Sequence, residues 1–96
     1  MSAQSRECFL KPTGFVQITP TVATGLTPPA ETNYALISCQ TQPVRFRDDA
    51  VDPTAAAGHL LPVGVFMTYT GDLKAIKFID TAAGASTVNI SYYKQV

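Results

Sequence analysis

The sequence has no tryptophan, a single histidine and only two cysteines, and charged residues make up 15% of its 96 residues. Cys8 and Cys39 are too few and too far apart for a Cys-x-x-Cys metal or redox site, and they define no disulfide framework. We expect them to be buried free thiols. A Ser-His or Cys-His catalytic pair would have to use His59, because the chain offers no other imidazole.

An excess of charge of one sign is also missing, because seven acidic residues balance seven basic ones. Binding to phosphates requires clustered lysine and arginine, which argues against nucleic acid as a partner. The basic residues are instead scattered over the chain as Arg6, Lys11, Arg45, Arg47, Lys74, Lys77 and Lys94. A small free monomer normally carries net charge for solubility, so a neutral chain of positive mean hydropathy is typical of a subunit of a larger assembly.

Long apolar segments are absent as well. No apolar run reaches the roughly 18 residues that a membrane span requires. The first residues, "MSAQSRECFLKPTG", lack the apolar central region of a signal peptide. We therefore expect synthesis in a cytoplasm and no membrane partner.

What the sequence does contain is a series of short runs rich in β-branched and aromatic residues. Each run is bounded by turn residues and predicts a strand, at residues 34–40, 44–48, 64–70, 74–80 and 87–94. Alternation predicts that Val44 and Phe46 face the core while Arg45 and Arg47 face outward. In the last run, Val88, Ile90 and Tyr92 are predicted to face inward by the same rule.

The connections between these runs are of hairpin length and contain glycine, which indicates antiparallel neighbours. The sequence therefore predicts one all-β domain, a small antiparallel β-sandwich or jelly-roll-like barrel with an extended N-terminal arm. We expect residues 34–96 to form the core. Residues 1–33 are expected to form the arm, with short strands near 6–11 and 14–19 and a loop at 20–33 that a partner could order.

The segment "VRFRDDAVDPTAAAGHLL", residues 44–61, holds most of the candidate chemistry. Asp48, Asp49 and Asp52 supply only three carboxylates and lack the alternating order of a calcium loop. We instead expect Asp52 and Pro53 to open a turn, and the other two aspartates to pair with the arginines or with a neighbouring chain. No metal ion or cofactor is expected.

The remaining candidates for catalysis are isolated residues. Nothing near His59 resembles a nucleophile elbow, and Asp72 and Asp80 are no better a glycosidase pair than any other two acids. Tyr69 and Tyr93 are the aromatic residues expected to be exposed, and tyrosines on strands are usually core or interface residues. We therefore expect that the protein is not an enzyme.

Three stretches resemble a class of small structural proteins of tailed bacteriophages. They are "VRFRDDAVDPTAAAGHLL", "GVFMTYTGDLKAIKFI" and "TVNISYY", and the resemblance covers about residues 35–93. The family pattern has glycine after the paired aspartates, where this chain has Ala50. That departure argues against a tight left-handed turn at this position.

The resemblance implies a structural protein of the virion, a capsid cement or decoration protein on the capsid surface. Its partners would be the major capsid protein and further copies of itself, as a homotrimer. The residues expected at these interfaces are Arg45, Arg47, Asp48, Asp49, Asp52, Tyr69 and Tyr93. Three alternatives remain open: a tail, fibre or head-to-tail connector component, a carbohydrate- or receptor-binding β module, and a small hydrolase that uses His59.

Overall fold

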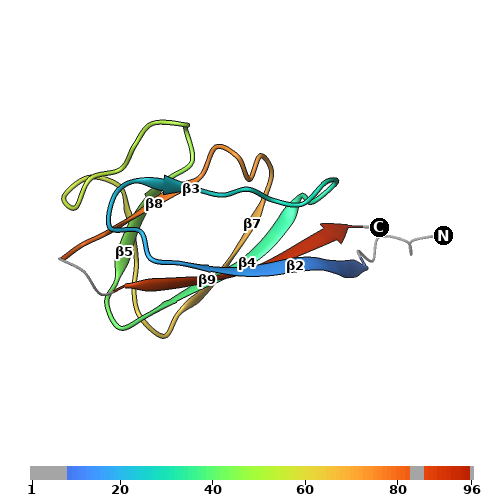
Figure 1. The fold of residues 1–96 in the computed structure, drawn as a ribbon, viewed down its shortest axis with the longest axis horizontal. Coiled ribbons are helices and arrows are strands. Elements are labelled where there is room, and N and C mark those ends of the chain that lie inside the picture. The colour runs from blue at the N-terminus through green and yellow to red at the C-terminus, as the bar shows by residue number, and fades with distance from the viewer. Residues whose placement is uncertain (1–8, 83–85, 96) are drawn as a thin grey trace.

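The computed structural model describes residues 9–82 and 86–95, and strands are the regular structure of this part of the chain (Figure 1). The strands are β2 (Leu10–Ile18), β3 (Thr24–Gly25), β4 (Tyr34–Gln40), β5 (Val44–Arg47), β6 (His59–Leu61), β7 (Phe66–Thr70), β8 (Lys77–Asp80) and β9 (Thr87–Gln95). They form two four-stranded sheets, with the orders β2-β9-β4-β7 and β3-β8-β5-β6. All the pairings are antiparallel. The connections that follow β4, β7 and β8 each lead to a strand of the other sheet, so the hairpins predicted at these connections are wrong. The predicted all-β sandwich is confirmed, and the sheets do not close into a barrel.

The core lies between the two sheets and follows from the alternation of side chains along the strands. In β9, Val88, Ile90 and Tyr92 are buried, as predicted. They pair with buried residues of β4, and the second sheet contributes Val44 and Phe78 to the same cluster. Phe46 is partly buried and packs against this cluster, in agreement with its predicted direction.

The N-terminal third contributes a strand to each sheet. Instead of two short strands, β2 runs without interruption along β9 from Leu10 to Ile18. The pairing register shifts between Pro12 and Gly14, but the strand continues through this point. Proline is tolerated here because β2 is an edge strand with one unpaired side. Residues 6–8 of the predicted first strand lie outside the described residues.

The segment at residues 20–33 is exposed or half-buried along most of its length, as expected of a loop, but Pro20 and Leu26 are buried. The Asp80 amide donates to the Pro20 carbonyl across 2.9 Å, and β3 pairs with β8. The segment thus crosses from one sheet to the other and packs against its own domain. The predicted strand at residues 74–80 is shorter than expected, because a turn at Asp72 keeps Lys74 and Ala75 out of β8.

Candidate interface

Arg45 points away from the core, as predicted, but its guanidinium is occupied within the chain. Its Nε donates to the Ala55 carbonyl and its Nη1 to the Gly58 carbonyl, both across 3.0 Å. Two hydrogen bonds from one planar guanidinium fix the positions of the two carbonyl groups relative to the Arg45 side chain. Arg45 therefore holds the loop at residues 48–58 against β5.

Two of the aspartates of this loop, Asp49 and Asp52, form exposed ion pairs. Arg47 binds both carboxylate oxygens of Asp49, across 3.1 and 2.5 Å. The hydrogen bond from Arg47 holds the pKa of the Asp49 carboxyl below its usual range. Lys77 of β8 binds Asp52 across 2.9 Å. The Arg47–Asp49 pair agrees with the prediction, whereas the Lys77–Asp52 pair was not predicted. Asp48 was also expected to pair with an arginine or with a neighbouring chain, but it accepts a hydrogen bond from Tyr69 instead.

Tyr69 is half-buried and packs against the core, which corrects the expectation that its ring is exposed. Its hydroxyl donates to Asp48 Oδ2 across 3.2 Å. Burial and the neighbouring Asp48 carboxylate raise the pKa of the Tyr69 phenol. Six of the seven predicted interface residues thus lie around the segment that follows β5.

The seventh predicted residue, Tyr93, lies apart from this group. Its side chain is on the outer face of the sheet β2-β9-β4-β7, where its ring meets Tyr34 edge to face, with centroids 5.9 Å apart. The structure therefore does not bring Tyr93 together with Arg45, Arg47 or the aspartates.

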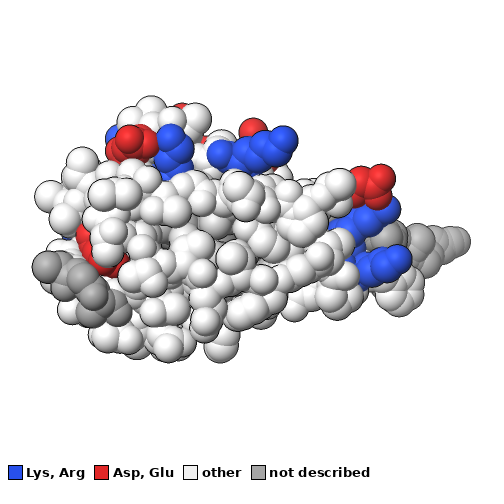
Figure 2. Space-filling view, viewed as in Figure 1, with Lys and Arg blue, Asp and Glu red and all other residues white. Residues whose placement is uncertain are grey.

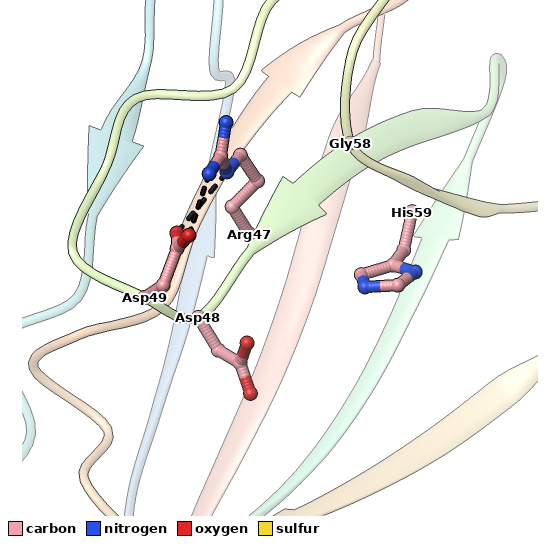
Figure 3. A pocket seen from close by; sticks show the side chains of 5 residues that line it. All are labelled: Arg47, Asp48, Asp49, Gly58 and His59. Atoms are coloured by element: carbon pink, nitrogen blue, oxygen red, sulfur yellow. Dashed lines mark hydrogen bonds and ion pairs between the residues drawn. The ribbon is translucent and has the colours of Figure 1, made fainter.

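A hollow of about 400 Å³ lies beside the Arg47–Asp49 pair and is lined by Arg47, Asp48, Asp49, Gly58 and His59. Figure 3 shows Arg47 and Asp49 facing each other, with Asp48 turned away and His59 on the opposite side of the hollow. The His59 ring packs against Phe46, with centroids 5.4 Å apart. The described lining residues include no serine or cysteine that His59 could activate.

The other residues considered for catalysis are placed elsewhere. Cys39 is buried, its Sγ donates to the Leu61 carbonyl across 3.3 Å, and burial raises the pKa of its thiol. Asp80 faces the interior, whereas Asp72 lies in an exposed turn, so these acids do not flank one cleft. Cys8 lies outside the described residues.

The three aspartates of the loop do not converge. Asp48 binds Tyr69, whereas Asp49 and Asp52 bind basic side chains. Within residues 9–82 and 86–95, no three His, Cys, Asp or Glu side chains are grouped so that they could hold a metal ion. The described part of the chain also contains no helix that is long and apolar enough to cross a membrane.

The conformation of Ala50 contradicts the expectation that a left-handed turn would not form here without glycine. Its φ is +64°, so the left-handed turn forms with alanine in place of glycine. The Ala50 amide donates to the Ala75 carbonyl across 3.2 Å, which holds the turn against the segment just before β8. A left-handed conformation is strained for a residue that has a Cβ.

The sequence interpretation missed a group of exposed apolar side chains between β6 and β7. We call this group the apolar rim; its members Leu60, Val63, Val65 and Phe66 are 49%, 46%, 45% and 70% exposed. β6 is an edge strand of one sheet and β7 an edge strand of the other, so the rim follows one side of the sandwich. The sequence pattern places Val65 and Phe66 in a predicted strand at residues 64–70 and assigns Leu60 and Val63 to no strand.

The comparisons with known proteins identify no relative: no protein-family model, curated protein or solved structure matches this chain.

Proposed function

We propose that this chain is a non-enzymatic structural protein of a virus particle, a capsid cement protein that binds between major capsid subunits and stabilises the shell. The observation that carries the proposal is the apolar rim. Contiguous exposed apolar groups are uncommon on small monomers and mark surfaces that become buried against a partner. The resemblance over residues 35–93 indicates what kind of partner that is.

A cement protein acts by adding buried area across the joint between subunits. Burial of apolar surface contributes about 25 cal/mol per Å², and the rim presents four large apolar side chains for this purpose. The ion pairs Arg47–Asp49 and Lys77–Asp52 lie on the other sheet and its loop. There they can exchange partners with a charged capsid surface and so select the orientation of binding.

The test is rebinding of the purified chain to particles assembled without it. A variant with Val63→Ser and Val65→Ser should bind at least roughly tenfold more weakly, because two exposed apolar side chains are lost from the contact. The matched control carries Val22→Ser, since this valine is also exposed but lies outside both the rim and the charged loop. Equal binding by the two variants would contradict the role of the rim, and no binding by the unmodified chain would contradict the proposed function.

A further inference from the structure

Among the residues that the structure describes, no charged side chain lies on the outer face of the sheet β2-β9-β4-β7. Because alternate residues point inward to the core, the outward set follows from the register of the four strands. We call this set the neutral face; its residues are Phe15, Gln17, Tyr34, Leu36, Ser38, Gln40, Phe66, Thr68, Thr70, Thr87, Asn89, Ser91 and Tyr93. An uncharged face four strands wide is unusual for a small protein in water, whose surface normally mixes both signs of charge.

The charged side chains gather elsewhere on the molecule. Figure 2 shows most of them along one margin and at the end where β2 begins, and one acidic group at the opposite end. At that end, Lys94 binds Glu31, and Lys11 lies opposite Lys94 in the pairing of β2 with β9. The arginines of β5 and Lys77 of β8 belong to the other sheet.

The neutral face has polar groups in its middle and aromatic rings at both margins. Gln17 Nε2 donates to Asn89 Oδ1 across 2.6 Å, and Asn89 Nδ2 donates to Gln40 Oε1 across 3.0 Å. These two bonds use only part of the donor and acceptor capacity of the three amides. Phe15 on the edge strand β2 is 60% exposed, and Phe66 on the opposite edge strand β7 is 70% exposed.

We propose that two copies of this chain pair face to face through their neutral faces, about a twofold axis that runs along the strands. Such an axis places β2 of one copy over β7 of the other, so each Phe15 lies at the margin that carries the partner's Phe66. A charged partner surface would lose its hydration here without a counter-charge in return. A second neutral face carries no such cost, and its amides offer both donors and acceptors.

The face is large enough for a specific contact. Four strands about 4.8 Å apart and about seven residues long give a face roughly 19 Å wide and 23 Å long. Such a face on each copy, with its protruding side chains, buries about 1,000–1,300 Å² in total, which reaches the lower range of specific interfaces. The proposal concerns the free chain in solution and does not depend on the role in a virus particle.

Sedimentation velocity of the full chain over a concentration series tests the pairing. We expect a monomer–dimer equilibrium that Ser91→Arg weakens roughly tenfold or more, because the charge is buried in the middle of the contact without a partner. Thr68→Lys, at an exposed position of the same face, should act in the same direction. Ala56→Arg, in the loop on the other sheet, is the matched control and should leave the dimer unchanged.

Three results would overturn the pairing. One is a chain that stays monomeric at every concentration, whether or not it also binds a neutral glycan. Another is a trimer, because a face-to-face contact closes as a pair and cannot build a threefold ring. The third is a dimer of undiminished affinity in both Ser91→Arg and Thr68→Lys, each checked for native folding by circular dichroism.

Discussion

The hydroxyl of Tyr69 lies 3.2 Å from Asp48 Oδ2, and this hydrogen bond joins the two sheets of the sandwich. Tyr69 belongs to β7 of one sheet, whereas Asp48 directly follows β5 of the other. The ring packs against the core while the hydroxyl reaches the loop that holds the paired charges. The position of this loop is therefore tied to the core of the domain.

Replacing Tyr69 by phenylalanine removes this bond and keeps the ring. We expect Tyr69→Phe to lower the free energy of unfolding by about 0.5–1.5 kcal/mol, the usual contribution of one hydrogen bond. Tyr93→Phe is the matched control, because its ring contact with Tyr34 does not require the hydroxyl. Urea denaturation measures both values, and an equal effect of the two substitutions would show that the Tyr69–Asp48 bond contributes nothing.

Ala50 holds a left-handed conformation that glycine adopts without strain. We expect Ala50→Gly to raise the free energy of unfolding by about 0.5–1 kcal/mol, because the relief of strain exceeds the added entropy of the unfolded chain. Ala56→Gly, in the same loop but without a positive φ, should instead be neutral or destabilising. Thermal unfolding of both variants checks this, and a lower melting temperature for Ala50→Gly would count against strain at this turn.

Arg45 should control how firmly the loop at residues 48–58 is held. Without the guanidinium, the carbonyls of Ala55 and Gly58 lose their donors, and the loop opens more often. We expect Arg45→Ala to increase elastase cleavage within the loop several-fold, and Arg45→Lys to increase it as well, because an ammonium cannot reproduce the planar fork. Lys74→Ala serves as the control. Unchanged cleavage in both Arg45 variants would refute this role.

Low pH should weaken the fold through Asp49 and Glu31. Hydrogen bonds from Arg47 and Lys94 lower the pKa of these carboxyls in the folded chain. Their contribution to stability is therefore present above their unfolded pKa values, near 4, and is lost as the pH falls through the lower folded values. Both groups are exposed, so the effect is small.

The measurement is the free energy of unfolding from pH 7 to pH 2. We expect the difference in stability between the unmodified chain and the variant with Asp49→Asn and Glu31→Gln to shrink below about pH 4, where the carboxyls become protonated. Parallel curves for the two proteins over the whole range would contradict a contribution from these ion pairs.

Local patterns in the sequence predicted the strands that build the core. Val44 and Ile90 could be assigned to the interior because alternation within a strand depends only on neighbouring residues. The three-residue strand β6 was missed, because it is too short to show a period. Ala50 was misjudged because the loop imposes its conformation through the bond to Ala75, which lies far away in the sequence.

Prediction of the candidate surfaces depends even more on pairings between strands that are far apart in the sequence. Gln17 and Asn89 are neighbours on the neutral face although 72 positions separate them in the sequence. Phe66 was expected within a strand that began at Gly64, and its high exposure follows from the place of β7 at the edge of the sheet. Which strand is an edge strand is a property of the topology, and the sequence pattern does not reveal it.

The proposed function makes this chain a component of a virus shell. The most direct test is its copy number in purified particles, measured by quantitative mass spectrometry against the major capsid protein. The proposed function predicts a copy number comparable to that of the capsid protein. A handful of copies per particle would instead indicate a tail or connector component, and its absence from the particle would contradict a structural role.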